Sequence, residues 1–244
     1  AETEDKDMGM FSRKDLIRLF APLLVEQLLA VLVGMADVVM VAAVGETAVS
    51  GVALVDSISV LVIQVLSAMA TGGAVVCSQY IGKKKPDQAC RAAGQLVLIT
   101  AALSLFIAAV AFIGNRHLLR LIFGSVETAV MDNAQTYFWF TAMSYPFLAL
   151  YNSGAALFRS MGNSKVSMKV SLAMNAINVA GNALCVFGLH MGVEGVAIPT
   201  LVSRLFAAVV MVFLVRNPKN SIRVDRLGQM IPQPDMIKKI LAVG

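Results

Sequence analysis

The chain has 244 residues, of which 58% are apolar and only 14% are charged, and its net charge at pH 7 is +5. Soluble domains carry roughly a quarter charged residues, so this composition excludes an ordinary soluble domain and indicates a membrane protein. The positive charge does not form an aromatic-rich basic patch and no nucleic-acid-binding motif occurs, so we expect no nucleic-acid partner. The three cysteines, Cys77, Cys90 and Cys185, lack metal-ligand spacing and are expected to be buried thiols.

Six apolar segments are long enough to cross a bilayer, which takes about 20 residues. Glycine, proline and asparagine residues typical of turns separate them. In chain order the predicted spans are 16–44, 52–78, 92–113, 137–158, 166–187 and 193–215. The sequence therefore predicts an all-α membrane protein whose core is a bundle of six transmembrane helices.

The positions of the basic residues predict how these spans are oriented. Of the 20 Lys and Arg residues, all but Arg116, Arg120 and Arg204 lie in or within a few residues of the N-terminal flank, the loops after spans two and four, or the segment after span six. Loops rich in Lys and Arg stay on the cytoplasmic side of a membrane. We therefore expect a multi-pass protein of the plasma membrane, specifically a bacterial inner membrane, with both termini in the cytoplasm.

The segment after span six indicates a repeated architecture. Residues 235–240 repeat the pattern of residues 15–20, which open span one. Transporters are often built from such repeats. We therefore expect a second six-helix lobe, either in the same chain or as a partner chain. The expected divisions are a cytoplasmic flank (1–15), a six-helix lobe (16–215), a cytoplasmic linker (216–234) and the start of a second lobe (235–244).

Span one carries two carboxylates, Glu26 and Asp37. A carboxylate at membrane depth costs about 2.5–3.5 kcal/mol on insertion scales, so it usually faces protein or water and has a role in transport. The two residues are about three helical turns apart and lie on one side of the helix. Glu26 either lines a substrate cavity or has a structural role, paired with Gln27 or a basic flank. Arg204 is either a counter-ion for one of these carboxylates or a side chain that snorkels through a water-filled cleft.

Spans two, four and five carry polar residues at helical spacing. Amides that face lipid would lack partners, so these stripes must meet other helices or water. Hydrogen bonding between helices would explain a single stripe, whereas three aligned stripes favour one hydrated interior. The stripes are Ser57, Gln64, Ser67, Thr71 and Ser78 in span two, Tyr137, Thr141, Ser144 and Asn152 in span four, and Ser171, Asn175, Asn178 and Asn182 in span five.

Several methionines of these spans could either fill the core or give the interior an adaptable apolar lining. The residues expected to line the substrate cavity are Glu26, Met35, Gln64, Met69 and Met174. Pro22 lacks a backbone N–H and is expected to bend span one near its cytoplasmic end.

Asp37 is the residue on which the functional hypothesis depends. A carboxylate in this position can exchange a proton, or it can hold a hard cation such as Na⁺ together with neutral oxygens. Asn178, Asn182 and Thr200 would supply those oxygens. Both Na⁺ and H⁺ therefore stay open as coupling ions, and no other cofactor is expected.

At these positions the chain resembles the multidrug and toxic compound extrusion (MATE) transporters. The residues that carry the resemblance occur in order along nearly the whole chain. They are Pro22, Asp37 and Gly45, then Gly72-Gly73 and 78–82, then 159–163, the asparagines within 175–182, and 195–200.

The resemblance implies a twelve-helix antiporter of two six-helix lobes, of which this chain matches the N-terminal one. Such proteins export cationic, amphipathic compounds in exchange for Na⁺ or H⁺ by alternating access. By position, the resemblance implies a cation or protonation site and a hydrogen-bond network around it. The site residues are Asp37, Asn178, Asn182 and Thr200, which would be the Na⁺ ligands of a sodium-coupled protein. The network residues are Tyr137 and Asn152 of span four, and we add Asn175 from the stripe of span five.

One departure from the family concerns Asn182. Many members carry Asp at this position, so the change removes a negative charge and leaves Asp37 as the main carboxylate.

Two other functions stay open beside cation-coupled export. A lipid-linked sugar flippase shares the two-lobe plan, but it would favour a strongly cationic cavity, and Arg204 is almost the only interior positive charge. A non-transporting membrane subunit is the second alternative. We do not expect an enzyme, because His117 and His190 lie at or near loops and no H-E-x-x-H or G-x-S-x-G motif occurs.

Overall fold

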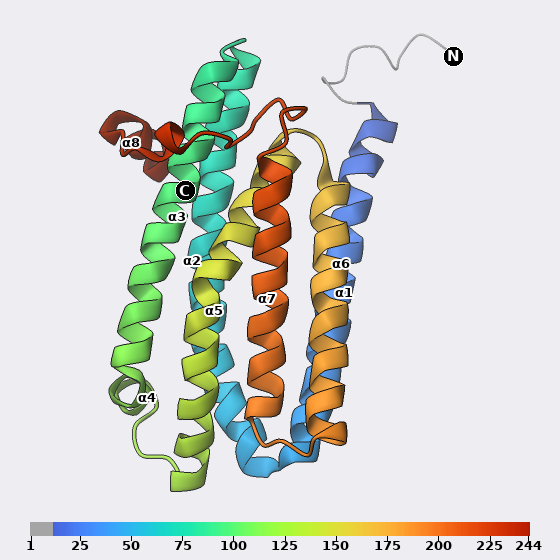
Figure 1. The fold of residues 1–244 in the computed structure, drawn as a ribbon, viewed down its shortest axis with the longest axis vertical. Helices are drawn as coiled ribbons and strands as arrows, with labels where there is room; N and C mark the ends of the chain where they lie inside the picture. Colours follow the sequence, from blue (N-terminus) through green and yellow to red (C-terminus); the bar gives the residue numbers. More distant parts are fainter. Residues whose placement is uncertain (1–11) are drawn as a thin grey trace.

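The computed structural model describes residues 12–244, which form eight α-helices and no strand (Figure 1). The helices are α1 (Arg13–Val44), α2 (Glu46–Gly82), α3 (Pro86–Ile113), α4 (Asn115–Phe123), α5 (Thr128–Ser160), α6 (Ser164–Ala183), α7 (Glu194–Val215) and α8 (Pro234–Val243). A π-helical turn, η1 (Leu184–Gly188), extends α6, and a 3₁₀ turn, η2 (Leu227–Met230), precedes α8. The six long helices correspond to the six predicted spans, so the predicted all-α bundle is confirmed.

Five of these helices are long and apolar enough to cross a membrane: α1, α2, α3, α6 extended by η1, and α7. The sixth, α5, has 33 residues and is also long enough at about 1.5 Å per residue. It lies in the middle of the lobe and packs against α2, α3 and α7 (Figure 1). Because neighbouring helices cover it, α5 carries more polar side chains than a helix that faces lipid.

The ends of the helices follow from local chemistry. A capping box starts α1: the Ser12 hydroxyl accepts from the backbone N–H of Asp15, and the Asp15 carboxylate accepts from the backbone N–H of Ser12. Between α1 and α2 the chain turns at a single residue, Gly45, whose φ of 150° favours glycine. The Lys- and Arg-rich connections, α2 to α3 and α5 to α6, lie at the same end of the lobe as the start of α1 (Figure 1).

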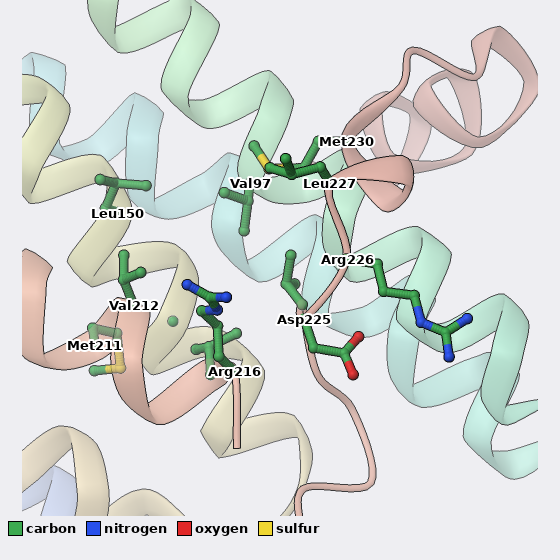
Figure 2. A pocket seen from close by; sticks show the side chains of 12 residues that line it. Val97, Leu150, Met211, Val212, Arg216, Asp225, Arg226, Leu227 and Met230 are labelled. Carbon is green, nitrogen blue, oxygen red and sulfur yellow. The ribbon is translucent and has the colours of Figure 1, made fainter. Parts of the chain in front are cut away.

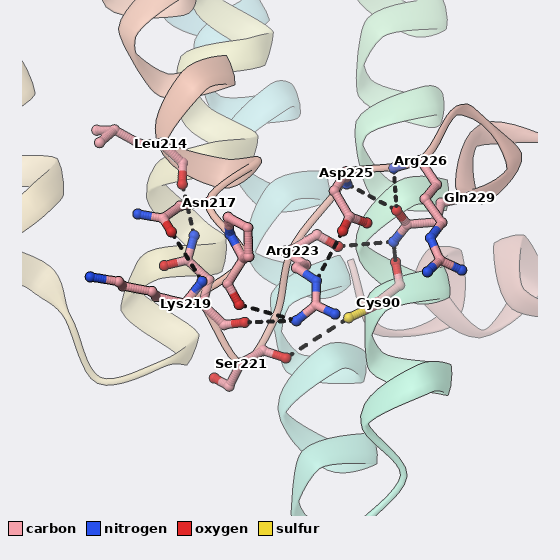
Figure 3. Close-up of polar contacts among 11 residues, drawn as sticks. Cys90, Leu214, Asn217, Lys219, Ser221, Arg223, Asp225, Arg226 and Gln229 are labelled. Atoms are coloured by element: carbon pink, nitrogen blue, oxygen red, sulfur yellow. Dashed lines mark hydrogen bonds and ion pairs between the residues drawn. The ribbon is translucent and has the colours of Figure 1, made fainter.

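The segment after α7 is held against α3 by the side chain of Gln229 (Figure 3). Its carbonyl oxygen accepts from the backbone N–H groups of Asp225 (3.0 Å) and Arg226 (2.9 Å). Its amide nitrogen donates to the carbonyls of Cys90 on α3 (2.8 Å) and Arg223 (2.9 Å). With all its groups paired, Gln229 fixes the fold of this segment and joins it to the bundle.

A second side-chain amide, that of Gln95 on α3, is fully buried and also forms hydrogen bonds with this segment. Its nitrogen donates to the carbonyls of Gln229 (2.8 Å) and Ile231 (2.6 Å), and its carbonyl oxygen accepts from the backbone N–H of Gln233 (2.9 Å). These bonds end just before α8, which packs against α2 and α3. The division of the chain into 1–15, 16–215, 216–234 and 235–244 stays a prediction, and most of its first part lies outside the described residues.

Two large apolar clusters stabilise the lobe, one toward each end, beside a small one formed by Ala70, Ala74 and Ala156. The cluster near the linker includes Leu157, Met211 and Ile222, and the other large cluster includes Val55, Phe138 and Val196. The three cysteines are free thiols, and only Cys77 is buried, so the expectation of burial is wrong for Cys90 and Cys185, which lie at partly covered helix surfaces.

Candidate cation site

A chain of hydrogen bonds joins α1, α6 and α7 through four polar side chains. The amide nitrogen of Asn182 donates to Oδ1 of Asp37 (2.8 Å) and to Oδ1 of Asn178 (2.9 Å). The amide nitrogen of Asn178 donates in turn to Oγ1 of Thr200 (3.2 Å), whose hydroxyl donates to the carbonyl of Val196 (2.8 Å). The structure thus brings together the four residues that the family resemblance assigned to the cation site, while cation binding itself stays a prediction.

Helical spacing explains why these groups meet. Asn178 and Asn182 are four residues apart on α6, as are Val196 and Thr200 on α7, so each pair lies on one face of its helix. Asn182 is in the last turn of α6, directly before the π-helical turn η1. Such turns are common where a helix positions functional groups.

The carbonyl oxygen of Asn182 is an unpartnered buried acceptor. The side chain is 1% exposed, and its Oδ1 has no hydrogen-bond partner within residues 12–244. Both amide hydrogens are already directed at acceptors, Asp37 and Asn178, so exchanging O and N would lose two hydrogen bonds. A buried acceptor left unpaired costs about 1–3 kcal/mol. This oxygen is therefore available to a cation or to water.

Asp37 and Asn182 line a cavity of about 150 Å³ with Thr200 and Tyr137. Val41, Val52 and Val196 are among the apolar side chains that form its walls. The volume is several times the ~10–15 Å³ that one water needs. It is therefore large enough for a cation that keeps part of its water shell.

Asp56 of α2 lines the same cavity and was missed by the sequence-based predictions. The hydroxyl of Tyr137 donates to Oδ1 of Asp56 at 3.4 Å, and the Asp56 side chain is otherwise exposed on the surface of the lobe. The signal was present in the sequence, because Asp56 is an acidic residue inside the predicted span 52–78, as Asp37 is inside 16–44.

Of the two interpretations of Arg204, the structure does not show the ion pair with a carboxylate within residues 12–244. The guanidinium of Arg204 donates to the hydroxyl of Ser144 on α5 at 2.6 Å. Within residues 12–244 the one ion pair joins Arg223 and Asp225 (3.0 Å), outside the bundle. Arg204 therefore carries an unpaired positive charge one helical turn from Thr200, near the cavity rather than bound to a carboxylate.

Glu26 lies outside this cavity and belongs to a separate hydrogen-bonded cluster. Its carboxylate accepts from the hydroxyl of Tyr151 on α5 (2.9 Å) and from the hydroxyl of Ser167 on α6 (3.3 Å). Its partners are thus two neutral hydroxyls rather than Gln27 or a basic flank. The contacts tie α1 to α5 and α6 in the half of the lobe nearer the linker.

The other residues predicted for the network are not joined to it in this structure. The amide of Asn175 reaches only Ser171 of its own helix, at 3.5 Å. The amide nitrogen of Asn152 is buried and has no partner among the described residues. Tyr137 is the one network residue that faces the cavity. Pro22 is buried inside α1, which continues through it as one helix, and its bend stays a prediction.

The residues predicted to line a substrate cavity are dispersed. Met35 and Gln64 are exposed, Met69 is partly buried, and Met174 packs against the apolar cluster near the linker. None of these four lines the cavity of Asp37. Their contact with substrate stays a prediction.

The expectation that three polar stripes share one interior is wrong for this lobe. Ser57, Gln64, Ser67 and Thr71 of α2 are exposed. The opposite face of α2 packs on α5 through small buried residues such as Gly51 and Ser59, which leaves the polar stripe on the outside.

A larger apolar cavity, of about 360 Å³, lies between the linker and helices α3, α5 and α7 (Figure 2). Leu150, Met211 and Leu227 line it, and Arg216 reaches into it from the end of α7. It shares no residue with the cavity of Asp37, and the carboxylate among its lining residues, Asp225, is paired with Arg223, so it is not the candidate cation site.

Six long helices, five of which line a cavity that contains two carboxylates, define a multi-pass membrane protein. The MatE family model matches residues 22–184, more than half of the chain. The chain belongs to this family, and the resemblance seen in the sequence is confirmed.

Individual relatives agree with this assignment. The chain is 28% identical over 244 residues to an uncharacterized transporter, YisQ, of Bacillus subtilis, covering 98% of this chain and 52% of that protein. It is 26% identical over 239 residues to a probable multidrug resistance protein, NorM, of Thermotoga maritima, covering 95% of this chain and 50% of that protein.

The fold is also similar to that of solved structures. Against a crystal structure of MATE in the bent conformation the TM-score is 0.85, with 20% identity, covering 95% of this chain and 51% of that chain. The chain spans about half the length of the curated relatives it matches. It corresponds to the N-terminal lobe of such a transporter.

Proposed function

We propose that this lobe is part of a cation-coupled exporter of amphipathic, cationic compounds, with the coupling ion bound at Asp37. The observation that carries the proposal is the combination of a carboxylate at membrane depth with the unpartnered Oδ1 of Asn182, both lining one cavity. The family membership supports export, since the relatives include proteins named for multidrug resistance and multidrug export.

The donor set fits Na⁺ as well as H⁺. Hard cations take carboxylate, amide and hydroxyl oxygens, and Asp37, Asn182 and Thr200 supply one of each at the cavity. The Oδ1 of Asn178 already accepts from Asn182, so it would join as a ligand only if that bond were exchanged. A proton would need the Asp37 carboxylate alone.

When bound, the ion supplies a positive charge that neutralises Asp37 and satisfies the free oxygen of Asn182. These two groups belong to α1 and α6, and the hydrogen bonds continue to α7. A change in occupancy therefore acts on three helices at once. Coupled to a second lobe, such a change would bias alternating access, which requires two lobes that move against each other.

The second lobe is part of this proposal, in the same chain or as a partner chain. Helix α1 exposes a long series of apolar side chains, including Leu28, Leu32 and Val39, which fits contact with lipid or with that lobe. We place the Lys- and Arg-rich end of the bundle in the cytoplasm, in the plasma membrane of a bacterium.

The test compares Asp37→Asn with Asp132→Asn, both introduced into the natural protein reconstituted in vesicles. Asp132 lies on the exposed side of α5, away from the cavity. Efflux of ethidium is measured under an imposed Na⁺ gradient and, separately, under an imposed proton gradient. We expect Asp37→Asn to abolish efflux with normal protein levels and Asp132→Asn to retain it. Full activity of Asp37→Asn would refute the proposal, and the gradient that drives transport identifies the ion.

A lipid-linked sugar flippase is the second candidate, because Arg204 places a positive charge near the cavity. The two carboxylates that line the cavity, Asp37 and Asp56, outnumber it and favour cationic cargo. Inhibition of ethidium transport by an anionic lipid head group would favour the flippase over the exporter.

A further inference from the structure

The cavity of Asp37 has a second acidic residue, on a different helix. Asp56 of α2 and Asp37 of α1 both line it, and the Tyr137 hydroxyl donates to Oδ1 of Asp56 at 3.4 Å. The fully buried Asn182 also lines this cavity, with its Oδ1 unpartnered. The cavity therefore contains two carboxylates together with an acceptor that no group in residues 12–244 satisfies.

The two carboxylates differ in what surrounds them. Asp37 is half-buried, accepts a short bond from Asn182, and has further oxygens nearby in Asn182 and Thr200. Asp56 is exposed, and within residues 12–244 its carboxylate accepts a single, longer bond, from the Tyr137 hydroxyl at 3.4 Å. A small cation that sheds water needs several oxygen ligands, which are present at Asp37. An organic cation, whose charge is spread over a larger volume, needs only a nearby negative charge and apolar surface.

We infer that Asp56 is a second cation-accepting residue of this cavity, which takes the positive group of the transported compound while Asp37 takes the coupling ion. The inference rests on the proposed function. Asp56 is open to the face of the lobe, where a large ligand can reach it, and Val49, Val52 and Ala53 give the cavity apolar walls on the same helix.

The charges around the cavity explain how the two ligands would oppose each other. Arg204 lies one helical turn from Thr200 and is held by Ser144 rather than by a carboxylate. Two carboxylates and one guanidinium leave one net negative charge, which one monovalent cation balances. A second cation would find no net negative charge left and would give the cavity one net positive charge, which is unfavourable where water is scarce. Ion and substrate therefore exclude each other electrostatically even though their ligating groups differ.

The position of Asp56 also avoids a conflict that an acidic residue at position 182 would create. The side chain of Asn182 lies 2.8 Å from Oδ1 of Asp37, so a carboxylate there would place two negative charges in direct contact. Asp56 adds the second charge from α2, across the cavity, and leaves Asn182 free to donate to Asp37.

The experiment measures equilibrium binding to the purified natural protein with three probes: radioactive Na⁺, the organic cation tetraphenylphosphonium, and the uncharged triphenylphosphine oxide of similar shape. For Asp56→Asn we expect the Kd of tetraphenylphosphonium to rise about tenfold or more, as for loss of one charge near a bound cation. Triphenylphosphine oxide should bind as in the unmodified protein, within about twofold. Na⁺ should lose less affinity than tetraphenylphosphonium, because the oxygens of Asp37, Asn182 and Thr200 that ligate it are kept. Asp56→Glu, which keeps the charge, should restore tetraphenylphosphonium binding.

Other outcomes would overturn the inference. Equal losses for the charged and uncharged phenyl compounds would show that Asp56 supports the shape of the site rather than its charge. Unchanged tetraphenylphosphonium binding in Asp56→Asn would exclude the assignment. Asp56→Ser is made in parallel, and failure of both variants to accumulate in the membrane would assign Asp56 a structural role instead. If Asp37→Asn abolishes efflux while Asp56→Asn binds normally, only the inference fails and the proposed function stands.

Discussion

Asn182 and Asp37 are joined across the cavity by a 2.8 Å hydrogen bond that connects the last turn of α6 to α1. The same amide nitrogen also donates to Oδ1 of Asn178, so Asn182 positions the Asp37 carboxylate and orients the side-chain amide of Asn178. Its carbonyl oxygen is the one group of this side chain without a partner in residues 12–244. Asn182 therefore determines both where Asp37 points and which neutral oxygen stands beside it.

Replacing Asn182 by Leu should weaken binding of the coupling ion strongly. The change removes the bond to Asp37 and the free oxygen, and a hydrogen bond to a charged group contributes about 1.5–3 kcal/mol. Ion affinity should fall by about tenfold to a hundredfold. Radioactive Na⁺ binding, or proton release if H⁺ couples, measures the loss. The control is Asn217→Leu, whose Oδ1 accepts from the backbone N–H of Lys219 beyond α7. Equal losses in both variants would show that the effect is not local to the cavity.

Glu26 and Tyr151 should respond differently from Asp37. The Glu26 carboxylate accepts from the Tyr151 hydroxyl at 2.9 Å and holds α1 against α5. Tyr151→Phe removes this bond, and the free energy of unfolding should fall by about 1–3 kcal/mol because a half-buried carboxylate loses a donor. The apparent melting temperature in detergent reports this change.

In the same variant, the ion dependence of efflux should stay as in the unmodified protein. A loss of coupling without loss of thermal stability would instead place the Glu26 cluster in the transport pathway, as one of the two sequence-based interpretations of Glu26 has it.

The fold was largely predictable because the length of an apolar run is enough to indicate a membrane span. The six runs of about 20 apolar residues correspond to the six long helices, but the helices extend further. Helix α2 begins at Glu46, six residues before the predicted start at position 52, because a polar first turn lies outside the apolar run. The short α4 and the turn η1 were not predicted, since neither has a periodic signal long enough to detect.

The candidate site was predictable only in part. Spacing placed Asn178 and Asn182 on one face of a helix, and the hydrogen bonds between them follow from that. The partners of Glu26 and Arg204 depend on which helices are neighbours, and the sequence has no local pattern for this. Asp56 was not predicted because it is not part of the polar stripe of α2. Ser57, Gln64 and Ser67 of that stripe face outward, whereas Asp56, next to Ser57 in sequence, lines the cavity.

The close contact of α2 with α5 should make Gly51 sensitive to the smallest enlargement. A Cβ at Gly51 would lie 2.8 Å from the backbone nitrogen of Ala134 and 3.0 Å from the carbonyl of Val130. Backbone atoms cannot move aside as a flexible side chain can, so Gly51→Ala should lower the free energy of unfolding by about 1–3 kcal/mol. The matched control is Gly82→Ala, where a Cβ meets nothing within 4 Å. Melting temperatures in detergent should fall only for the first variant, and equal values would show that the helices can separate at no cost.

Gln95 should control whether the segment after α7 stays on the bundle. Its amide makes three hydrogen bonds to that segment, to Gln229, Ile231 and Gln233, and it is fully buried between α3 and the linker. Gln95→Leu keeps the approximate volume but leaves two carbonyls and one N–H without partners, at about 1–3 kcal/mol each. The linker should then open more often, because local opening follows local stability.

Limited trypsin digestion measures this opening through cleavage after Arg226, which is exposed but lies in a segment held by Gln229. Cleavage of Gln95→Leu should be faster by about a hundredfold or more, because three unpaired groups at about 1 kcal/mol each already amount to about 3 kcal/mol. Gln88→Leu, on the same helix, is the control, since Gln88 makes no side-chain hydrogen bond within the described part of the chain. Because an opened linker changes the connection to whatever follows it, the variant should also reduce efflux while Na⁺ binding at Asp37 stays normal. Equal cleavage rates in the two variants would mean that Gln229 and its contacts with Cys90 and Arg223 hold the linker without Gln95.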